Sequence, residues 1–126
     1  MLQKNDLLLI TGGNRGLGLA SARLALQRGY RVLLTARSSE KGQAALAELA
    51  APAGQASFHP LDVTDAASIQ ALVQHIQQTH GQLDALLNNA GIHYDSQQHA
   101  SDADLQIGYE AMETNFFGPW RLAQAL

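Results

Sequence analysis

A cluster of glycines near the start of the chain has the spacing of an anion-binding loop. Residues 11–18 read TGGNRGLG and directly follow the apolar run from Leu7 to Ile10. Glycine permits positive φ angles and a close approach of the backbone to a ligand, and the free N–H groups at the start of a helix attract phosphate. If this segment joins a strand to a helix, it is predicted to bind a diphosphate. The alternative is an ordinary turn between the two elements.

The hydrophobic pattern predicts the elements that would position this loop. Short apolar strands are expected at residues 7–10, 31–35, 56–59 and 83–87, and helices at 16–28, 38–50, 64–81 and 105–119. In the first helix, Leu17, Ala20 and Leu24 have the spacing of one apolar face. Strands that alternate with helices form parallel sheets through right-handed crossovers. The expected fold class is therefore α/β, a doubly wound parallel sheet with helices on both faces, in one domain over residues 1–126.

Composition restricts the partners and the chemistry. The 126 residues include 8 basic and 11 acidic side chains, and the net charge of −3 without a block of like charge argues against nucleic-acid or membrane partners. The absence of cysteine excludes thiol chemistry and fits the cytoplasm, where we expect the protein to reside. The histidines lack metal-ligand spacing, and the i, i+5 pair His75 and His80 is expected to diverge on a helix, so no metal site is predicted.

Four motifs together resemble the short-chain dehydrogenase/reductase family. They are the segment 11–18, the residues LDV at 61–63, the residues NNAG at 88–91, and Asn115. Within the family, the segment 11–18, the residues LTAR at 34–37 and the residues TNFFG at 114–118 are most similar to the NADPH-dependent carbonyl reductases. The resemblance covers nearly the whole chain. It implies a Rossmann-type sheet, a nicotinamide dinucleotide cofactor and the reduction of a carbonyl to an alcohol by hydride transfer.

The resemblance also implies which residues hold the cofactor. They are Gly12, Asn14, Arg15, Gly16, Leu17, Gly18, Arg37, Asp62, Val63, Asn89, Ala90 and Gly91. Arg37 ends the second predicted strand, where an acidic residue would favour NAD(H), and with Arg15 it supplies two cations for a 2′-phosphate. NADP(H) is therefore predicted to be preferred over NAD(H). Two solvated surface arginines, with Glu40 close in sequence, are the alternative.

Two of these implied roles have structural alternatives. Asp62 would accept a hydrogen bond from the adenine amino group, or would serve only the turn before a helix. Asn89, with its small neighbours, would leave room for a ribose, or would mainly bond the backbone of adjacent strands. His93 and Tyr94, in the polar loop expected at the rim of the site, would contact a substrate or would only be solvated.

The family's catalytic Ser and Tyr-x3-Lys are not found in this sequence. The residues four positions after the three tyrosines are Leu34, Gln98 and Glu113, and the only lysines are Lys4 and Lys41. We therefore expect the catalytic residues beyond residue 126, on a fifth strand and its helix, so that a small carbonyl substrate would react only after completion by a C-terminal half. The chain alone is predicted to be inactive. The alternative is a non-catalytic module that binds a nucleotide or a partner.

Asn115 matches the family's asparagine, which is implied to support a proton relay. Pro119 lacks the N–H that would bond to the Asn115 carbonyl in a helix, although Gly118 and Pro119 would also simply kink or end the helix.

A sheet that stops after the fourth strand leaves an open edge at Leu83, Leu86 and Leu87, and the last helix presents Phe116, Phe117 and Trp120 with few partners. Self-association or partner binding is expected.

Overall fold

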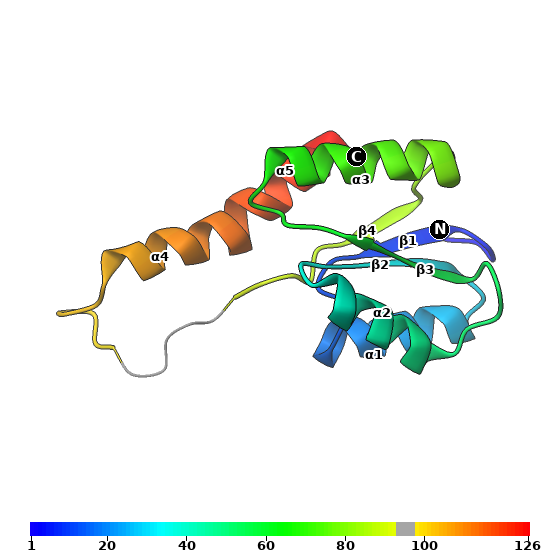
Figure 1. Ribbon diagram of the computed structural model, residues 1–126, viewed down its shortest axis with the longest axis horizontal. Helices are drawn as coiled ribbons and strands as arrows, with labels where there is room; N and C mark the ends of the chain where they lie inside the picture. Colours follow the sequence, from blue (N-terminus) through cyan, green and yellow to red (C-terminus); the bar gives the residue numbers. More distant parts are fainter. Residues whose placement is uncertain (93–97) are drawn as a thin grey trace.

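The computed structural model describes residues 1–92 and 98–126, so His93 and Tyr94 lie outside the described residues. The chain forms, in order, β1 (Leu7–Ile10), α1 (Gly16–Gln27), β2 (Arg31–Ala36), α2 (Ser39–Leu49), β3 (Ala56–Pro60), α3 (Ala66–Thr79), β4 (Ala85–Leu87), α4 (Leu105–Met112), the π-helical turn η1 (Glu113–Phe117) and α5 (Gly118–Ala125) (Figure 1). Each predicted strand and helix is present.

The four strands form one parallel sheet in the order β3-β2-β1-β4. Leu9 of β1 is the register partner of Leu33 on one side and of Leu86 on the other. The connection from β3 to β4 carries the chain across to the opposite side of β1, so the direction of winding reverses between β1 and β4. Such a reversal opens a crevice at the carboxyl ends of the strands. The predicted doubly wound α/β fold is confirmed, and β4 lies at the edge of the described sheet, as expected.

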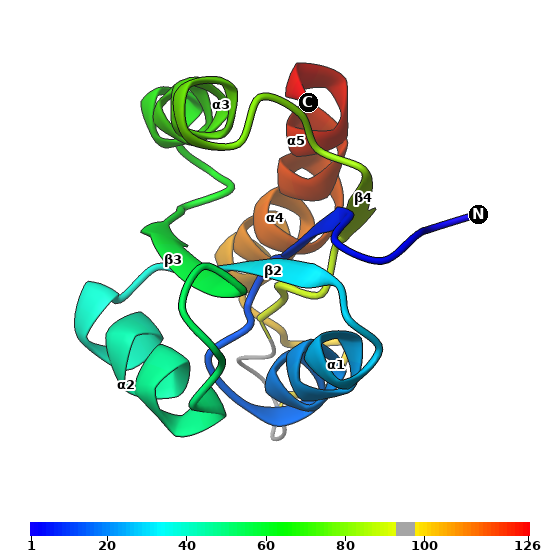
Figure 2. The same cartoon turned by 90° about the vertical axis from the view of Figure 1, so that its right-hand side faces the viewer.

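Helices cover both faces of the sheet. Figure 2 shows α1 and α2 on one side, and α3 and α5 on the other. Because successive side chains of a strand point to opposite faces, the strands divide their apolar residues between two cores. One core contains Leu7, Leu9 and Leu33 packed with Leu72 and Leu122, and the other contains Ile10, Val32 and Leu34 packed with Ala22 and Ala45.

The predicted apolar face of α1 is wrong. Leu17, Ala20 and Leu24 point to solvent, whereas Gly18, Leu19, Ala22 and Ala25 are buried. Small residues allow the backbone of α1 to approach the strands closely, and this outweighs the larger apolar area of the leucines. The helical periodicity was sufficient to predict the helix, but not the face that packs.

Side-chain caps and glycines set the ends of several helices. Ser38 caps α2, because its hydroxyl accepts a bond from the Lys41 N–H at 3.2 Å, and the Asp65 carboxylate caps α3 by accepting from the Ala67 N–H at 3.0 Å. Gly29, after α1, has the φ angle of 85° that a left-handed cap requires.

The last helical segment continues through the predicted interruption. Gly118 donates its N–H to the Glu113 carbonyl, an i to i+5 bond, so the disturbance is a π turn immediately before Gly118 and Pro119, and α5 follows without a break. Gly118 also packs on Val63, since a Cβ on Gly118 would lie 2.6 Å from the Val63 Cγ2. Through this contact and the buried Leu122, α5 is docked beside α3.

Candidate functional site

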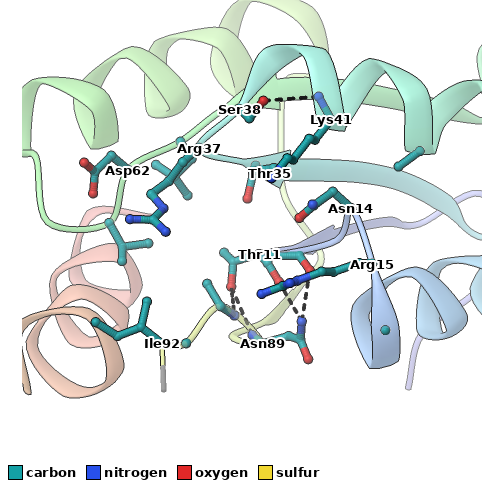
Figure 3. A pocket seen from close by; sticks show the side chains of 18 of the residues that line it. Thr11, Asn14, Arg15, Thr35, Arg37, Ser38, Lys41, Asp62, Asn89 and Ile92 are labelled. Carbon is teal, nitrogen blue, oxygen red and sulfur yellow. Dashed lines mark hydrogen bonds between the residues drawn. The ribbon is translucent and has the colours of Figure 1, made fainter. Parts of the chain in front are cut away.

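A cavity of about 960 Å³ lies at the carboxyl ends of the four strands (Figure 3). Its volume falls in the upper part of the roughly 300–1,000 Å³ range of cofactor and ligand sites. Eleven predicted site residues line it: Gly12, Asn14, Arg15, Gly16, Leu17, Arg37, Asp62, Val63, Asn89, Ala90 and Gly91. Gly18 and Asn115, also predicted, are not among the lining residues.

The glycine loop between β1 and α1 contributes free backbone donors. Gly12 and Gly16 have φ angles of 63° and 56°, which a residue with a side chain adopts only under strain. Arg15 is the N-cap of α1 but gives no side-chain cap to the helix. The first turn of α1 therefore presents N–H groups without a side-chain acceptor, as an anion-binding helix start requires.

Thr11 and Asn89 join this loop to the end of β4. The buried Thr11 hydroxyl accepts bonds from the backbone N–H groups of Asn89 at 3.0 Å and Ala90 at 2.9 Å. In return, the Asn89 side-chain amide donates to the carbonyls of Thr11 at 3.1 Å and Gly12 at 3.2 Å. Asn89 therefore supports neighbouring backbone, as the structural alternative had suggested, while its small neighbours Ala90 and Gly91 line the cavity.

The absence of a side chain at Gly18 allows the glycine loop and Asn89 to approach each other closely. A Cβ on Gly18 would lie 2.6 Å from both the Asn89 Nδ2 and the Gly12 carbonyl oxygen. The glycine thus lets α1 approach the loop, and its place in the site is to shape the loop that lines the cavity.

Three cations point into the cavity from different elements. Arg15 comes from the glycine loop, Arg37 follows β2, and Lys41 lies in the first turn of α2 (Figure 3). Glu40, the nearby acid that left the cofactor preference open, is not among the lining residues, although Glu48 is. Lys41 was not predicted to line the site, because lysine was considered in the sequence only as a catalytic residue. The Ser38 cap was the available signal, since it fixes where α2 starts.

Asp62 lines the cavity near Arg37 and contributes a carboxylate to it (Figure 3). Its Oδ1 accepts bonds from the Thr64 hydroxyl at 2.6 Å and the Thr64 N–H at 2.9 Å. The Thr64 hydroxyl bond is the main cause that lowers the pKa of Asp62, and the charge of Arg37 adds to it. The carboxyl is therefore ionised at neutral pH. The turn role proposed for Asp62 is present, and its Oδ2 forms no hydrogen bond within the described part of the chain.

Asn115 lies behind the cavity wall, in the π turn. Its side chain accepts from the Ile92 N–H at 2.7 Å and donates to the Ile92 carbonyl at 2.9 Å. Ile92 itself lines the cavity, and a Cβ on Gly91 would lie 3.2 Å from the Asn115 Oδ1. Asn115 thus fixes the chain just after β4, and both polar atoms of its side chain are used in doing so.

Three histidines lie close together on the side of the sheet that α3 covers. The ring of His75 lies 4.6 Å from that of His59 and 5.6 Å from that of His80 between centroids. The predicted divergence of His75 and His80 is wrong, because His80 is the C-cap of α3 and its φ of −115° departs from helical geometry. Across residues 1–92 and 98–126, no three His, Asp or Glu side chains are arranged to hold a metal ion, and no helix there has the length and apolarity of a membrane span.

This site can be compared with known proteins. The family model described as short chain dehydrogenase matches residues 6–126. The chain belongs to this family. Among short-chain dehydrogenases, it is 44% identical to human "Carbonyl reductase [NADPH] 1" over 112 residues, which cover 87% of this chain and 39% of the relative. It is 38% identical to human "Carbonyl reductase [NADPH] 3" over 122 residues, which cover 94% of this chain and 42% of the relative.

Solved structures of short-chain dehydrogenase fold agree with the architecture. A variant of actinorhodin polyketide ketoreductase with NADPH superposes with a TM-score of 0.86 at 29% identity, over 96% of this chain and 46% of that one. The structure of gox2181 gives a TM-score of 0.90 at 27% identity, over 98% and 48%. The chain therefore spans about two fifths of the length of the carbonyl reductases and about half of these structures.

Proposed function

We propose that these 126 residues are the NADP(H)-binding portion of a short-chain oxidoreductase that reduces a carbonyl to an alcohol. The observation that carries the proposal is the glycine loop at the base of a cleft that three cations, Arg15, Arg37 and Lys41, enter from separate elements. The reduced nicotinamide supplies the hydride when bound. The names of the related carbonyl reductases, which specify NADPH, support the same cofactor.

The residues present fit such a cofactor along its length. The N–H groups of the glycine loop and of the start of α1 suit the diphosphate. The end of the cleft that holds Arg37 suits a 2′-phosphate, because Arg37 occupies the position at which an acidic residue would repel that phosphate. The ionised Asp62 can accept from an adenine amino group, with Val63 beside it. The wall formed by Asn89, Ala90 and Gly91 leaves space for the other ribose.

Catalysis requires groups that this sequence does not contain. None of its three tyrosines is followed by a lysine at the fourth position. We propose that the Ser, Tyr and Lys come from residues outside these 126, and that the 126-residue chain binds the dinucleotide without turnover. Asn115 would support the proton relay through its backbone carbonyl, because its side chain is occupied by Ile92 and Pro119 offers no N–H.

Nucleotide titration tests the cofactor assignment. NADPH is expected to bind at least about tenfold more tightly than NADH, which corresponds to about 1.4 kcal/mol. Arg37→Ala is expected to remove most of this preference. Arg28→Ala is the matched control, since it removes an exposed arginine beyond the C-terminal end of α1 and makes the same change in net charge. Equal affinities for the two nucleotides in the unmodified chain would contradict the assignment.

A turnover assay distinguishes a catalytically active chain from a module that only binds the nucleotide. With saturating NADPH and reactive aldehydes or quinones, the 126-residue chain is expected to bind the nucleotide but not to consume it. Consumption above the rate of the nucleotide alone would refute the claim that catalysis needs other residues. The single domain over residues 1–126, the cytoplasmic location and the lack of nucleic-acid or membrane partners remain predictions.

A further inference from the structure

Three histidines form a contact between β3 and α3 that the proposed function does not use. His59 lies near the end of β3, His75 lies on α3, and His80 is the C-cap of that helix. The ring centroid of His75 is 4.6 Å from that of His59 and 5.6 Å from that of His80. We call these residues the histidine cluster. His75 is its central member, and it joins the helix to the strand.

The surroundings of the histidine cluster favour uncharged rings. The Nε2 atoms of His75 and His80 are buried and form no hydrogen bond with the described residues. None of the three rings forms an ion pair with an acidic side chain of residues 1–92 and 98–126. A protonated imidazole carries an N–H on both nitrogens, so protonation would bury a charged donor without an acceptor. Taking up a proton is therefore costly while the rings are packed together.

The charges around the histidine cluster act in the same direction as burial. Burial lowers the pKa of His75, and the charge of His59 lowers it further. Burial also lowers the pKa of His80, with contributions from His75 and from Arg31 at the start of β2. A histidine whose pKa is lowered by packing resists protonation only while it stays packed. The packed cluster is therefore favoured above about pH 6.5 and weakened as the pH falls below it.

The other charged groups on the elements around α3 have partners of their own. Arg121 of α5 pairs with Glu113 at 2.8 Å. Asp84, in the connection from α3 to β4, accepts bonds from the Leu7 N–H at 2.7 Å and from the Gln82 amide at 2.6 Å. These groups are held by their own contacts, so they do not neutralise a charge on the histidine cluster.

The first turn of α3 connects the histidine cluster to the proposed nucleotide site. The Asp62 N–H donates to the Ser68 hydroxyl in this turn at 2.9 Å, and the Asp65 carboxylate caps the same turn. Asp62 and Val63 both line the cavity. Because a helix moves largely as a rigid unit, a shift of α3 relative to β3 also moves the residues that its first turn holds.

The position of β3 at the sheet edge allows this contact to open. β3 pairs only with β2, and none of its five residues is fully buried. In contrast, Ile69, Leu72 and Ile76 anchor α3 in the core that contains β1. Segments with few buried contacts open at a lower free-energy cost than the core does. The contact between α3 and β3 can therefore loosen while the core stays packed.

We propose that the histidine cluster makes nucleotide binding sensitive to pH. When its rings take up protons, α3 and β3 separate, and the segment 61–65 leaves the position in which Asp62 and Val63 line the cavity. Release of the protons restores that position, so the chain binds a nicotinamide dinucleotide more tightly above neutral pH than below it. The inference rests on the proposed function, because it assigns the dinucleotide to this cavity.

Nuclear magnetic resonance tests the contact without any nucleotide. On lowering the pH from about 8 to about 5.5, the backbone amide signals of residues 61–65 are expected to shift with the same midpoint as the ring protons of His75. Titration of Asp62 does not produce this shift, because the Thr64 hydroxyl lowers the pKa of Asp62 and keeps its carboxyl ionised over this range. EDTA in the buffer keeps stray metal ions from the imidazoles.

Two variants distinguish the histidine cluster from a general effect of pH. His75→Asn removes the ring that joins α3 to β3, so the shift of residues 61–65 is expected to be lost. His99→Asn is the matched control, because it removes an exposed histidine before α4 and should leave the shift unchanged. A shift that persists in His75→Asn would overturn the proposal. Circular dichroism at both pH values checks that each variant is folded.

His59→Asn tests the same contact from the strand. Its loss both exposes His75 and removes a neighbouring charge, so the midpoint of the His75 ring protons is expected to rise. The midpoint of residues 61–65 is expected to rise with it. An unchanged midpoint for His75, or a midpoint of residues 61–65 that does not follow it, would show that the rings do not act through this contact.

Calorimetric titration with NADP⁺ at about pH 8 and about pH 5.5 tests the effect on the nucleotide site. The 2′-phosphate of this ligand takes up a proton near pH 6, so the unmodified chain is compared with His75→Asn, which meets the same ligand. The affinity of the unmodified chain is expected to fall at least about fivefold more than that of His75→Asn. Equal falls would overturn the proposal. Absence of binding at the higher pH would refute the proposed function and the effect on affinity with it, whereas the amide shifts judge the histidine contact independently.

Discussion

Replacing Thr11 by valine tests whether the junction between the glycine loop and β4 stabilises the fold. Valine has the shape of threonine, so the core volume is kept, but the hydroxyl that accepts from the N–H groups of Asn89 and Ala90 is lost. Each N–H left without a partner costs about 1–3 kcal/mol. Both lie in a partly buried region beside the cavity, so the lower half of that range applies to each. The expected loss in the free energy of unfolding, summed over the two N–H groups, is about 2–4 kcal/mol.

Urea unfolding followed by circular dichroism measures this loss. With a slope of about 2 kcal/mol per molar urea, the middle of the usual range, the midpoint is expected to fall by about 1–2 M. Thr11→Ser keeps the acceptor and loses only a methyl group, so its midpoint should stay much closer to that of the unmodified chain. If the valine variant is as stable as the serine variant, the two hydrogen bonds do not hold the loop and the reasoning fails.

Two further predictions concern packing and pH. Gly18→Ala is expected to destabilise the fold by about 1–3 kcal/mol and to weaken nucleotide binding, because its Cβ would overlap Asn89 and Gly12; Gly108→Ala, a helical glycine with open space around its Cβ, should be neutral or stabilising in the same unfolding assay. Burial lowers the pKa of both His75 and His80. The charge of His59 lowers the pKa of His75 further. The charges of His75 and Arg31 do the same for His80. The unfolded chain therefore binds more protons, so the melting temperature should hold above about pH 6.5 and fall below it, and His75→Asn should flatten that fall. A melting temperature that does not change down to about pH 5.5 would contradict this assignment.

The strand and helix order could be predicted because each element has a strong local signal. β1 is an unbroken apolar run, α3 has apolar residues at helical spacing, and Ser38 and Asp65 are good caps for the helices that follow them. The exposed face of α1 was not predictable in the same way. Which residues of α1 are buried depends on how closely the helix can approach the sheet. The small residues Gly18 and Ala22 determine that distance, and hydrophobicity alone does not indicate it.

The site was predictable at strand ends and not where it depends on contacts between distant residues. Parallel strands bring their carboxyl ends to one edge, so residues after each strand were expected together, and most of those named do line the cavity. The bonds of Thr11 to Asn89 join residues 78 positions apart, and those of Asn115 to Ile92 join residues 23 apart. Sequence spacing does not indicate which backbone atoms such side chains reach, because the answer depends on strand register and on the path of the loop.

The arrangement of charge along the cleft gives the proposed cofactor one direction. Arg37 and Lys41 lie where β2 ends and α2 starts, whereas the residues after β4 supply backbone, amide and apolar groups. A dinucleotide with an additional phosphate at one end would place that end against the cations, which sends its nicotinamide end toward Ile92. That residue is held by the side chain of Asn115, which lies in the π turn η1. The π turn therefore holds the part of the cleft wall beside which the proposed hydride transfer would take place.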